Sequence, residues 1–168
     1  MNKILLIITG SIAASRCKEI IALLNINEVQ ISCILTNEAK KYTKILDIKK
    51  LLKNRIFTDE DEKKNKMLHI NLSRDNDIIV MCPATANSIA KFANGYGDNL
   101  ASNTLLASNK KILFVPAMNS FMWHNKINQK NVRLLKDSGH EFIGPTVGNL
   151  KCGEFGLSLI HISEPTRP

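Results

Sequence analysis

The chain has 168 residues and a mass of 18.8 kDa, a length at which one domain can bury a core. Hydrophobic residues make up 44% and charged residues 23%, which excludes disordered and low-complexity classes. The first apolar run, residues 4–8, is too short for a signal-peptide core or for the roughly 20 residues of a membrane span. We therefore expect a cytoplasmic protein without membrane contact.

The formal net charge is +8, from 23 basic and 15 acidic residues. Such a charge suits an anionic partner, such as nucleic acid, a membrane surface or a phosphorylated small molecule. The lysines are scattered along the chain, however, rather than gathered into one basic segment with interleaved aromatic residues of the kind that stack on bases. Abundant Lys, Ile and Asn are also typical of AT-rich coding sequence, so we expect no nucleic-acid partner.

Short apolar runs alternate with longer amphipathic stretches, and this pattern predicts βαβ units around a parallel sheet. Strands are expected at residues 3–9, 29–35, 78–82, 112–115 and 141–143. Helices are expected at residues 12–24, 86–92, 100–108 and 127–138, with a helical or broken-helical region at 38–53. The charged segment 58–66 is interpreted as an exposed loop rather than a site. The predicted fold class is α/β, a single-domain, three-layer Rossmann/flavodoxin-like fold with a mostly parallel sheet.

The four cysteines form no Cys-x-x-Cys pair, and no histidine stands at zinc-ligand spacing, so neither a disulfide framework nor a metal site is indicated. Cys17, Cys33 and Cys82 fall in apolar elements and are interpreted as small buried side chains. Cys152 precedes Gly153 in a glycine-containing loop, where a thiol is accessible. His140, at the end of a predicted helix, is interpreted as a C-terminal cap that interacts with the helix dipole.

Ligands of doubly wound sheets bind beyond the carboxyl ends of the strands, so the residues that follow each predicted strand are the candidate site. Gly10 and Ser11 follow the first strand and begin a helix, where free N–H groups and the dipole favour a phosphate. An ordinary helix cap is the alternative. The Gly-x-Gly-x-x-Gly fingerprint of dinucleotide sites is missing, which favours a mononucleotide over NAD.

Polar or small residues also follow three further strands. Residues 36–38 are either a helix cap or ligand contacts, and the small side chains and hydroxyls of residues 83–88 let a flat ring approach the backbone. After the next strand, Asn119 is available to hold a carboxylate by hydrogen bonds. Met122 and Trp123, which come directly behind, are interpreted as core.

Five ordered motifs carry a resemblance to one family. They are GSIAA from Gly10, LHINL from Leu68, PATANS with IAKFANGYGDNLASNTLLA from Pro83, PAMNSFMW from Pro116 and KCGEFG from Lys151. Together they resemble the homo-oligomeric flavin-containing cysteine decarboxylases, from residue 3 to about residue 156. The resemblance implies FMN as cofactor and the decarboxylation of 4′-phosphopantothenoylcysteine to 4′-phosphopantetheine in coenzyme A biosynthesis, through a thioaldehyde and an enethiol.

The resemblance also implies roles for single residues. His69 is the expected catalytic histidine of the decarboxylation half, although a histidine between two apolar residues would otherwise be interpreted as partly buried packing. Cys152 is expected to donate the proton in the final reduction. Substrate contacts are expected at Asn119, Asn149, Leu150 and Lys151. FMN contacts are expected at Gly10, Ser11, Ile12, Thr36, Asn37, Glu38, Thr85, Ala86, Asn87, Ser88 and Ala117.

In this family the cofactor lies between neighbouring subunits of a trimer, so we expect a homo-oligomer built on trimers. After Gly156 the family's Gly-x-Gly-Arg-Met segment is replaced by LSLIHISEPTRP, which resembles a translated sequencing adapter. We therefore expect residues 1–156 to be a truncated flavoprotein domain and residues 157–168 a non-native tail, with a natural variant tail as the alternative. A ligase domain for phosphopantothenate and cysteine follows such domains in many bacteria and is a possible missing partner.

Three other functions stay open at this point. A decarboxylase of peptide-bound cysteine would share His69, PAMNSFMW and the flavin. A flavin prenyltransferase shares the fold but is not expected to carry PAMN or the Cys-Gly loop. Non-catalytic relatives regulate a protein phosphatase and usually carry acidic tails; the short tail here, with one Glu and one Arg, argues against that function.

Overall fold

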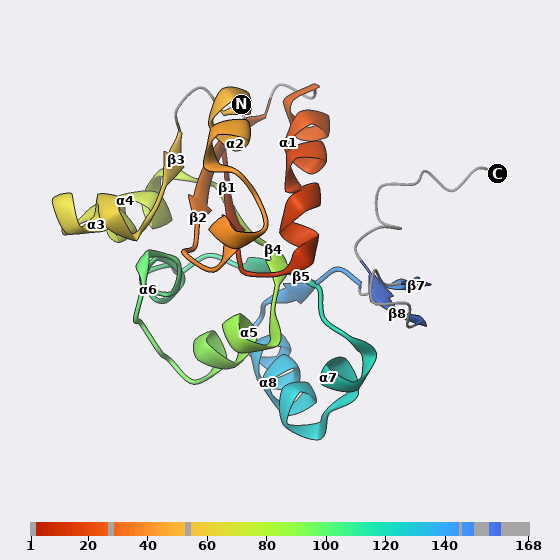
Figure 1. Ribbon diagram of the computed structural model, residues 1–168. Coiled ribbons are helices and arrows are strands. Elements are labelled where there is room, and N and C mark those ends of the chain that lie inside the picture. The colour runs from red at the N-terminus through yellow and green to blue at the C-terminus, as the bar shows by residue number, and fades with distance from the viewer. Residues whose placement is uncertain (1–2, 27–28, 53–54, 145, 150–154, 159–168) are drawn as a thin grey trace.

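The computed structural model describes residues 3–26, 29–52, 55–144, 146–149 and 155–158. Its centre is a six-stranded sheet in the order β3-β2-β1-β4-β5-β6, in which all neighbouring strands are parallel (Figure 1). The strands are β1 (Lys3–Ile8), β2 (Gln30–Leu35), β3 (Ile56–Phe57), β4 (Ile78–Ala84), β5 (Ile112–Pro116) and β6 (Glu141–Phe142). The predicted α/β fold with a parallel sheet is confirmed.

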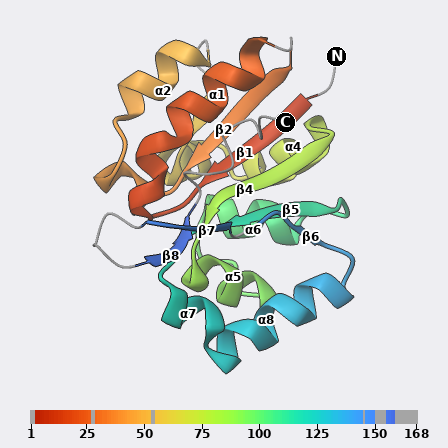
Figure 2. The same ribbon diagram turned by 90° about the vertical axis from the view of Figure 1, so that its right-hand side faces the viewer.

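Helices cover both faces of this sheet and make three layers. Figure 2 shows α1 and α2 on one side of the sheet and α5 and α8 on the other. The α-helices are α1 (Cys17–Ile26), α2 (Ile45–Leu51), α3 (Asp59–Lys64), α4 (Leu68–Asp75), α5 (Ala86–Ala93), α6 (Leu100–Leu106), α7 (Ser120–His124) and α8 (Lys126–Asp137). Two 3-10 segments are η1 (Ile12–Arg16) and η2 (Ala39–Lys41), and an antiparallel hairpin pairs β7 (Thr146–Asn149) with β8 (Phe155–Ser158). In the described part of the chain no helix is long and apolar enough to cross a membrane.

The sequence of β1 explains why the core has two halves. Successive side chains of a strand point to opposite faces of the sheet. Leu6 and Ile8 are buried with residues of α1 and α2, whereas Leu5 and Ile7 are buried with residues of α4, α5, α6 and α8. A strand that is covered on both faces has an unbroken apolar sequence, and that is the sequence of residues 4–8.

Several elements differ from the sequence prediction. The predicted loop at 58–66 is wrong, because most of it forms α3. A capping box starts this helix: the Thr58 N–H donates to Asp61 Oδ2 at 2.8 Å, and the Thr58 side chain accepts from the N–H of Asp61. The predicted helix at 12–24 is divided into η1 and α1, and the region 38–53 is broken, as expected, into η2 and α2. The strand β3 and the β7–β8 hairpin were not predicted.

The dipole-capping role predicted for His140 is wrong. Its Nδ1 accepts a hydrogen bond from the Ile112 N–H at 3.3 Å, and its ring lies 5.3 Å from the Phe92 ring and 6.1 Å from the Phe114 ring, between centroids. Burial lowers the pKa of His140, so the neutral ring is favoured over the cation that a dipole cap requires. By contrast Cys17, Cys33 and Cys82 are free and buried, as predicted.

Candidate active site

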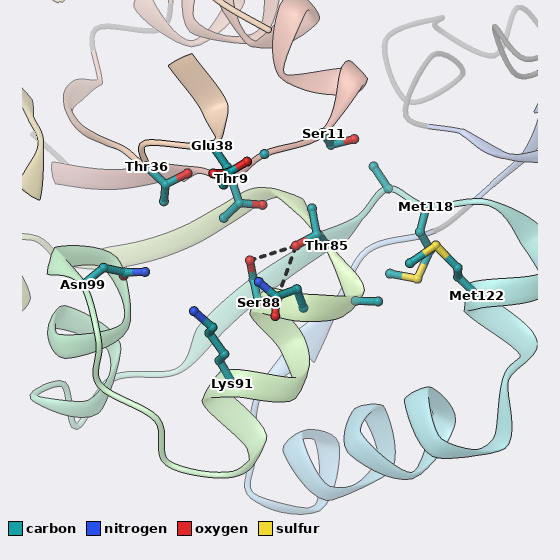
Figure 3. Close-up of a pocket in the computed structure, with 14 residues that line it drawn as sticks. Thr9, Ser11, Thr36, Glu38, Thr85, Ser88, Lys91, Asn99, Met118 and Met122 are labelled. Atoms are coloured by element: carbon teal, nitrogen blue, oxygen red, sulfur yellow. Dashed lines mark hydrogen bonds between the residues drawn. The ribbon is translucent and has the colours of Figure 1, made fainter. Parts of the chain in front are cut away.

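A cavity of about 500 Å³ lies at the carboxyl ends of β1, β2, β4 and β5 (Figure 3). The chain builds outward from β1 through β2 to β3, and then from β4 through β5 to β6. The β1–β4 pair is therefore the topological switch point at which such sheets bind ligands. The cavity volume falls in the range of small-molecule sites, about 300–1,000 Å³. Its lining consists of Thr9, Gly10, Ser11, Thr36, Glu38, Thr85, Ala86, Asn87, Ser88, Lys91, Asn99, Ala117, Met118 and Met122.

All but two of the residues expected to contact FMN line this strand-end cavity. The exceptions are Ile12, which begins η1 and is mostly exposed, and Asn37, which lines a second cavity. The sequence prediction missed Thr9, Lys91, Asn99, Met118 and Met122.

The turn after β1 touches the turn after β2 so closely that only glycine fits between them. A Cβ atom on Gly10 would lie 2.4 Å from Glu38 Cβ. Two further contacts fix this turn: Thr9 Oγ1 donates to Pro83 O at 2.6 Å, and Ser11 Oγ accepts from the Ala13 N–H at 3.3 Å. At Gly10 the wall of the cavity is therefore backbone without a side chain, and a ligand can approach it closely there.

The turn after β4 places the start of α5 at the cavity. Thr85 caps the helix, since its Oγ1 accepts from the Ser88 N–H at 3.2 Å and lies 2.9 Å from Ser88 Oγ (Figure 3). The other first-turn N–H groups of a helix have no acceptor within it, and together with the dipole they favour an anion such as a phosphate.

Lys91 brings a cation to the same cavity, and its ammonium group is held by the Asp98 carboxylate. That ion pair lowers the pKa of Asp98. The sequence could have indicated Lys91 as a cavity residue. It follows Ser88 by three residues and Asn87 by four, so all three lie on the same face of the helix.

The turn after β5 holds Asn119 at the start of α7. Its Oδ1 accepts from the Met122 N–H at 2.8 Å, which leaves the two hydrogens of Nδ2 directed elsewhere. Among the described residues nothing accepts from this Nδ2, and Asn119 is exposed. The prediction that Met122 is core is wrong: the side chain lines the cavity, because α7 begins at its rim. Trp123 does pack against the core.

His69 lies elsewhere, in the first turn of α4. Its Nδ1 is 2.8 Å from Glu62 Oε1 of α3, and the two side chains are 26% and 18% exposed. The residues that line the strand-end cavity do not include His69. Glu62 lines the second cavity, of about 540 Å³, which shares Asn99 with the first. Sequence reasoning missed Glu62, because segment 58–66 was interpreted as a loop.

Most of the expected substrate loop lies outside the part of the chain that the structure describes. Leu150, Lys151 and Cys152 lie outside the described residues. Asn149 is the last residue of β7, and its side chain lies outside the described part as well.

The flavoprotein family model matches residues 1–163. The chain belongs to the flavoprotein family. This flavoprotein is 34% identical over 163 residues to a probable phosphopantothenoylcysteine decarboxylase of Streptococcus mutans, and the match covers 95% of the chain and 91% of that relative. It is 35% identical over 160 residues to the coenzyme A biosynthesis bifunctional protein CoaBC of Haemophilus influenzae, and here the match covers 94% of the chain but 40% of the relative. The flavoprotein thus spans less than half the length of such bifunctional relatives.

Solved structures share the fold over almost the whole flavoprotein. A PPC decarboxylase mutant complexed with pantothenoylaminoethenethiol matches with a TM-score of 0.82 and 28% identity, over 93% of this chain and 88% of that one. The peptidyl-cysteine decarboxylase EpiD matches with a TM-score of 0.81 and 29% identity, over 94% of this chain and 92% of that one. The resemblance to the flavin-containing cysteine decarboxylases is thereby confirmed.

Proposed function

We propose that this flavoprotein is an FMN-dependent decarboxylase of the cytoplasm that converts 4′-phosphopantothenoylcysteine to 4′-phosphopantetheine in coenzyme A biosynthesis. The observation that carries the proposal is the strand-end cavity, at which the turns after β1, β2, β4 and β5 meet. The names of the Streptococcus and Haemophilus relatives support this substrate and pathway.

The residues around the strand-end cavity suit FMN. The turn at Gly10 has no room for a Cβ, the first turn of α5 offers unpaired N–H groups to a phosphate, and Lys91 supplies a cation. When bound, FMN supplies a reversible hydride acceptor for the substrate carbon that carries sulfur, so that carbon dioxide can leave without net oxidation.

We assign substrate binding and the two proton transfers to three side chains. Asn119, whose Oδ1 is held by the Met122 N–H, binds the substrate carboxylate through Nδ2 and orients it. His69 accepts a proton from the substrate in the decarboxylation half, as a general base. Cys152 donates a proton to the substrate carbon in the final reduction, and residues 149–151 belong to the loop that covers the substrate.

We further propose that a second copy completes each site, in a trimer or a multiple of trimers. His69 does not line the cavity of its own chain, so a neighbouring subunit would have to supply it. Exposed apolar side chains on α7 and α8 support such an interface: Phe121, next in sequence to the cavity-lining Met122, is 80% exposed, and Ile127 is 74% exposed. Light scattering on the purified protein measures the mass of the oligomer.

We also propose where the decarboxylase domain ends. Residues 1–156 would form the decarboxylase domain, and residues 157–168 a non-native tail, of which Leu157 and Ser158 belong to β8 and the rest lie outside the described residues. The bifunctional relatives support a ligase domain in the full gene product. Sequencing the source locus tests this: the reading frame should continue from Gly156 into Gly-x-Gly-Arg-Met, and a natural LSLIHISEPTRP would contradict it.

A peptidyl-cysteine decarboxylase is the second candidate, because EpiD complexed with a substrate peptide matches with a TM-score of 0.84. The FMN-loaded protein should be given 4′-phosphopantothenoylcysteine and, separately, a peptide that ends in cysteine. Carbon dioxide and 4′-phosphopantetheine are expected from the first substrate only. Turnover of the peptide alone would support the second candidate, and inhibition of a protein phosphatase without turnover of either would support a regulatory subunit.

A further inference from the structure

The α3–α4 corner, defined here by Glu62, His69 and Asn103, joins three helices around one imidazole. Glu62 Oε1 is 2.8 Å from His69 Nδ1, although the ring nitrogen is not aligned for a full hydrogen bond. An ionised carboxylate carries no hydrogen, so an N···O distance of 2.8 Å is favourable only when the proton is on Nδ1. In a neutral ring that leaves the lone pair on Nε2.

The carboxylate of Glu62 is itself held from the side of α6. Asn103 Nδ2 lies 3.4 Å from both of its oxygens. The Asn103 side chain lies against the backbone of Gly97, since a Cβ on Gly97 would lie 2.6 Å from Asn103 Oδ1. The start of α3 is tied to the same helix, because Asp59 Oδ1 accepts the Leu100 N–H at 2.9 Å. The corner thus has a continuous support from α6 to the imidazole.

The other carboxylates of the second cavity have different partners. Asp98 pairs with Lys91, and Asp59 accepts the Leu100 N–H. Lys63 and Lys66 also line this cavity, but no contact of either with the imidazole is part of the described structure. Glu62 is therefore the carboxylate available to His69.

We propose that Glu62 is a positioning residue for His69. It holds the proton on Nδ1 and fixes the ring, so that Nε2 accepts the substrate proton. The resulting imidazolium is stabilised by the adjacent carboxylate, and the proton then passes to solvent. This inference rests on the proposed function, because it requires that His69 acts as a base.

The variant Glu62→Gln tests the inference, since glutamine keeps the size of the side chain and an oxygen for Asn103. The kcat for carbon dioxide release should fall roughly 10- to 100-fold, the usual cost of removing the partner of a functional imidazole in metal sites, while KM and FMN content stay near wild type. Glu60→Gln is the matched control: Glu60 lies on the same helix, pairs with Lys40 at 3.0 Å and does not contact His69. It should retain wild-type kcat.

A second measurement needs no variant of Glu62. Ring ¹⁵N shifts of the neutral imidazole in the wild-type protein should show His69 as the Nδ1–H tautomer. The His69 signal is the one that His69→Asn removes. A wild-type Nε2–H tautomer, or an unchanged kcat in Glu62→Gln, would overturn the positioning role.

The same experiments separate this inference from the proposed function. If His69→Asn abolishes carbon dioxide release while Glu62→Gln retains the wild-type rate, only the positioning role fails. If His69→Asn itself releases carbon dioxide normally, the role of His69 in the proposed function fails, and that of Glu62 fails with it.

Discussion

The strand-end cavity and the α3–α4 corner serve the same proposed reaction but are built in different ways. The cavity consists of turns and helix caps, such as those of Gly10, Ser11 and Thr85, whose places follow from the order of the strands. The corner depends on a contact between Glu62 and His69, which belong to two different helices. Cofactor binding is thus set mainly by backbone topology, and the geometry of the base by side-chain packing between elements.

This difference predicts two kinds of variant. Changes to the turns should alter FMN binding, whereas changes at the corner should alter the rate and leave the cofactor in place.

The largest effect is expected from His69→Asn. Carbon dioxide release should fall by at least about 100-fold, since general base catalysis contributes about 10²–10⁴-fold, and the protein should still hold FMN. Labelled carbon dioxide and flavin absorbance measure the two quantities. Loss of FMN in this variant would contradict the separate roles proposed here, in which the cavity binds the cofactor and the corner sets the rate.

Cys152→Ser extends the comparison to the substrate loop. The carboxylate should still leave, because the thiol is assigned to the later proton transfer, but 4′-phosphopantetheine should not accumulate. Mass spectrometry of the products follows both steps. An unchanged yield of 4′-phosphopantetheine would remove Cys152 from the mechanism.

Gly10→Ala tests the cavity alone. The new Cβ would lie 2.4 Å from Glu38 Cβ and push the two turns apart, at a cost of about 1–3 kcal/mol in the free energy of unfolding. FMN retention should be lost. Gly139→Ala is the control, because Gly139 has a φ of +91° with open space around the Cβ position, away from the cavity lining. It should destabilise the fold but keep FMN.

Lys110→Met tests whether α4 can be weakened without disturbing the corner. Lys110 Nζ donates to Ser73 O at 2.8 Å, to Arg74 O at 2.9 Å and to Asn76 O, at the end of α4 remote from His69. Hydrogen bonds to charged groups contribute about 1.5–3 kcal/mol, so urea unfolding should show a loss of about 1–2 kcal/mol in a partly exposed site. A fall in kcat as large as that of Glu62→Gln would mean that the whole of α4, rather than one contact, sets the geometry.

The smallest effect concerns pH and His140, which belongs to neither region. Burial lowers the pKa of His140 in the folded protein, so below about pH 6.5 the unfolded chain binds the proton more readily. Stability should therefore fall as the pH drops from about 6.5, and His140→Gln should reduce this loss. Urea unfolding at about pH 7.5 and about pH 5.5 measures it. An equal loss in both proteins would contradict the assignment.

Most of the sheet was predictable, because a strand such as β1 is covered on both faces and its apolar run is unbroken. The strand β3 was not predictable, because its two residues give no periodic pattern. The error over α3 was avoidable: Thr58 and Asp61 have the spacing of a capping box, but the surrounding charges favoured a loop.

The residues of the site likewise fall into those that were predictable from the sequence and those that were not. Most residues of the strand-end cavity were predictable because parallel strands place their following turns at one edge, and Lys91, which was missed, could have been found from its helical spacing to Asn87 and Ser88. Met122 was misassigned, since periodicity does not distinguish a core side chain from one that lines a cavity. The contact between Glu62 and His69 depends on how α3 packs against α4, and no local rule of sequence specifies that.

The claim that the strand-end cavity binds FMN can be tested directly by the flavin content of the purified protein. The protein should be yellow, denaturation should release a flavin with the mass of FMN, and Gly10→Ala but not Gly139→Ala should lose it. A folded protein that stays colourless after incubation with FMN would contradict the account.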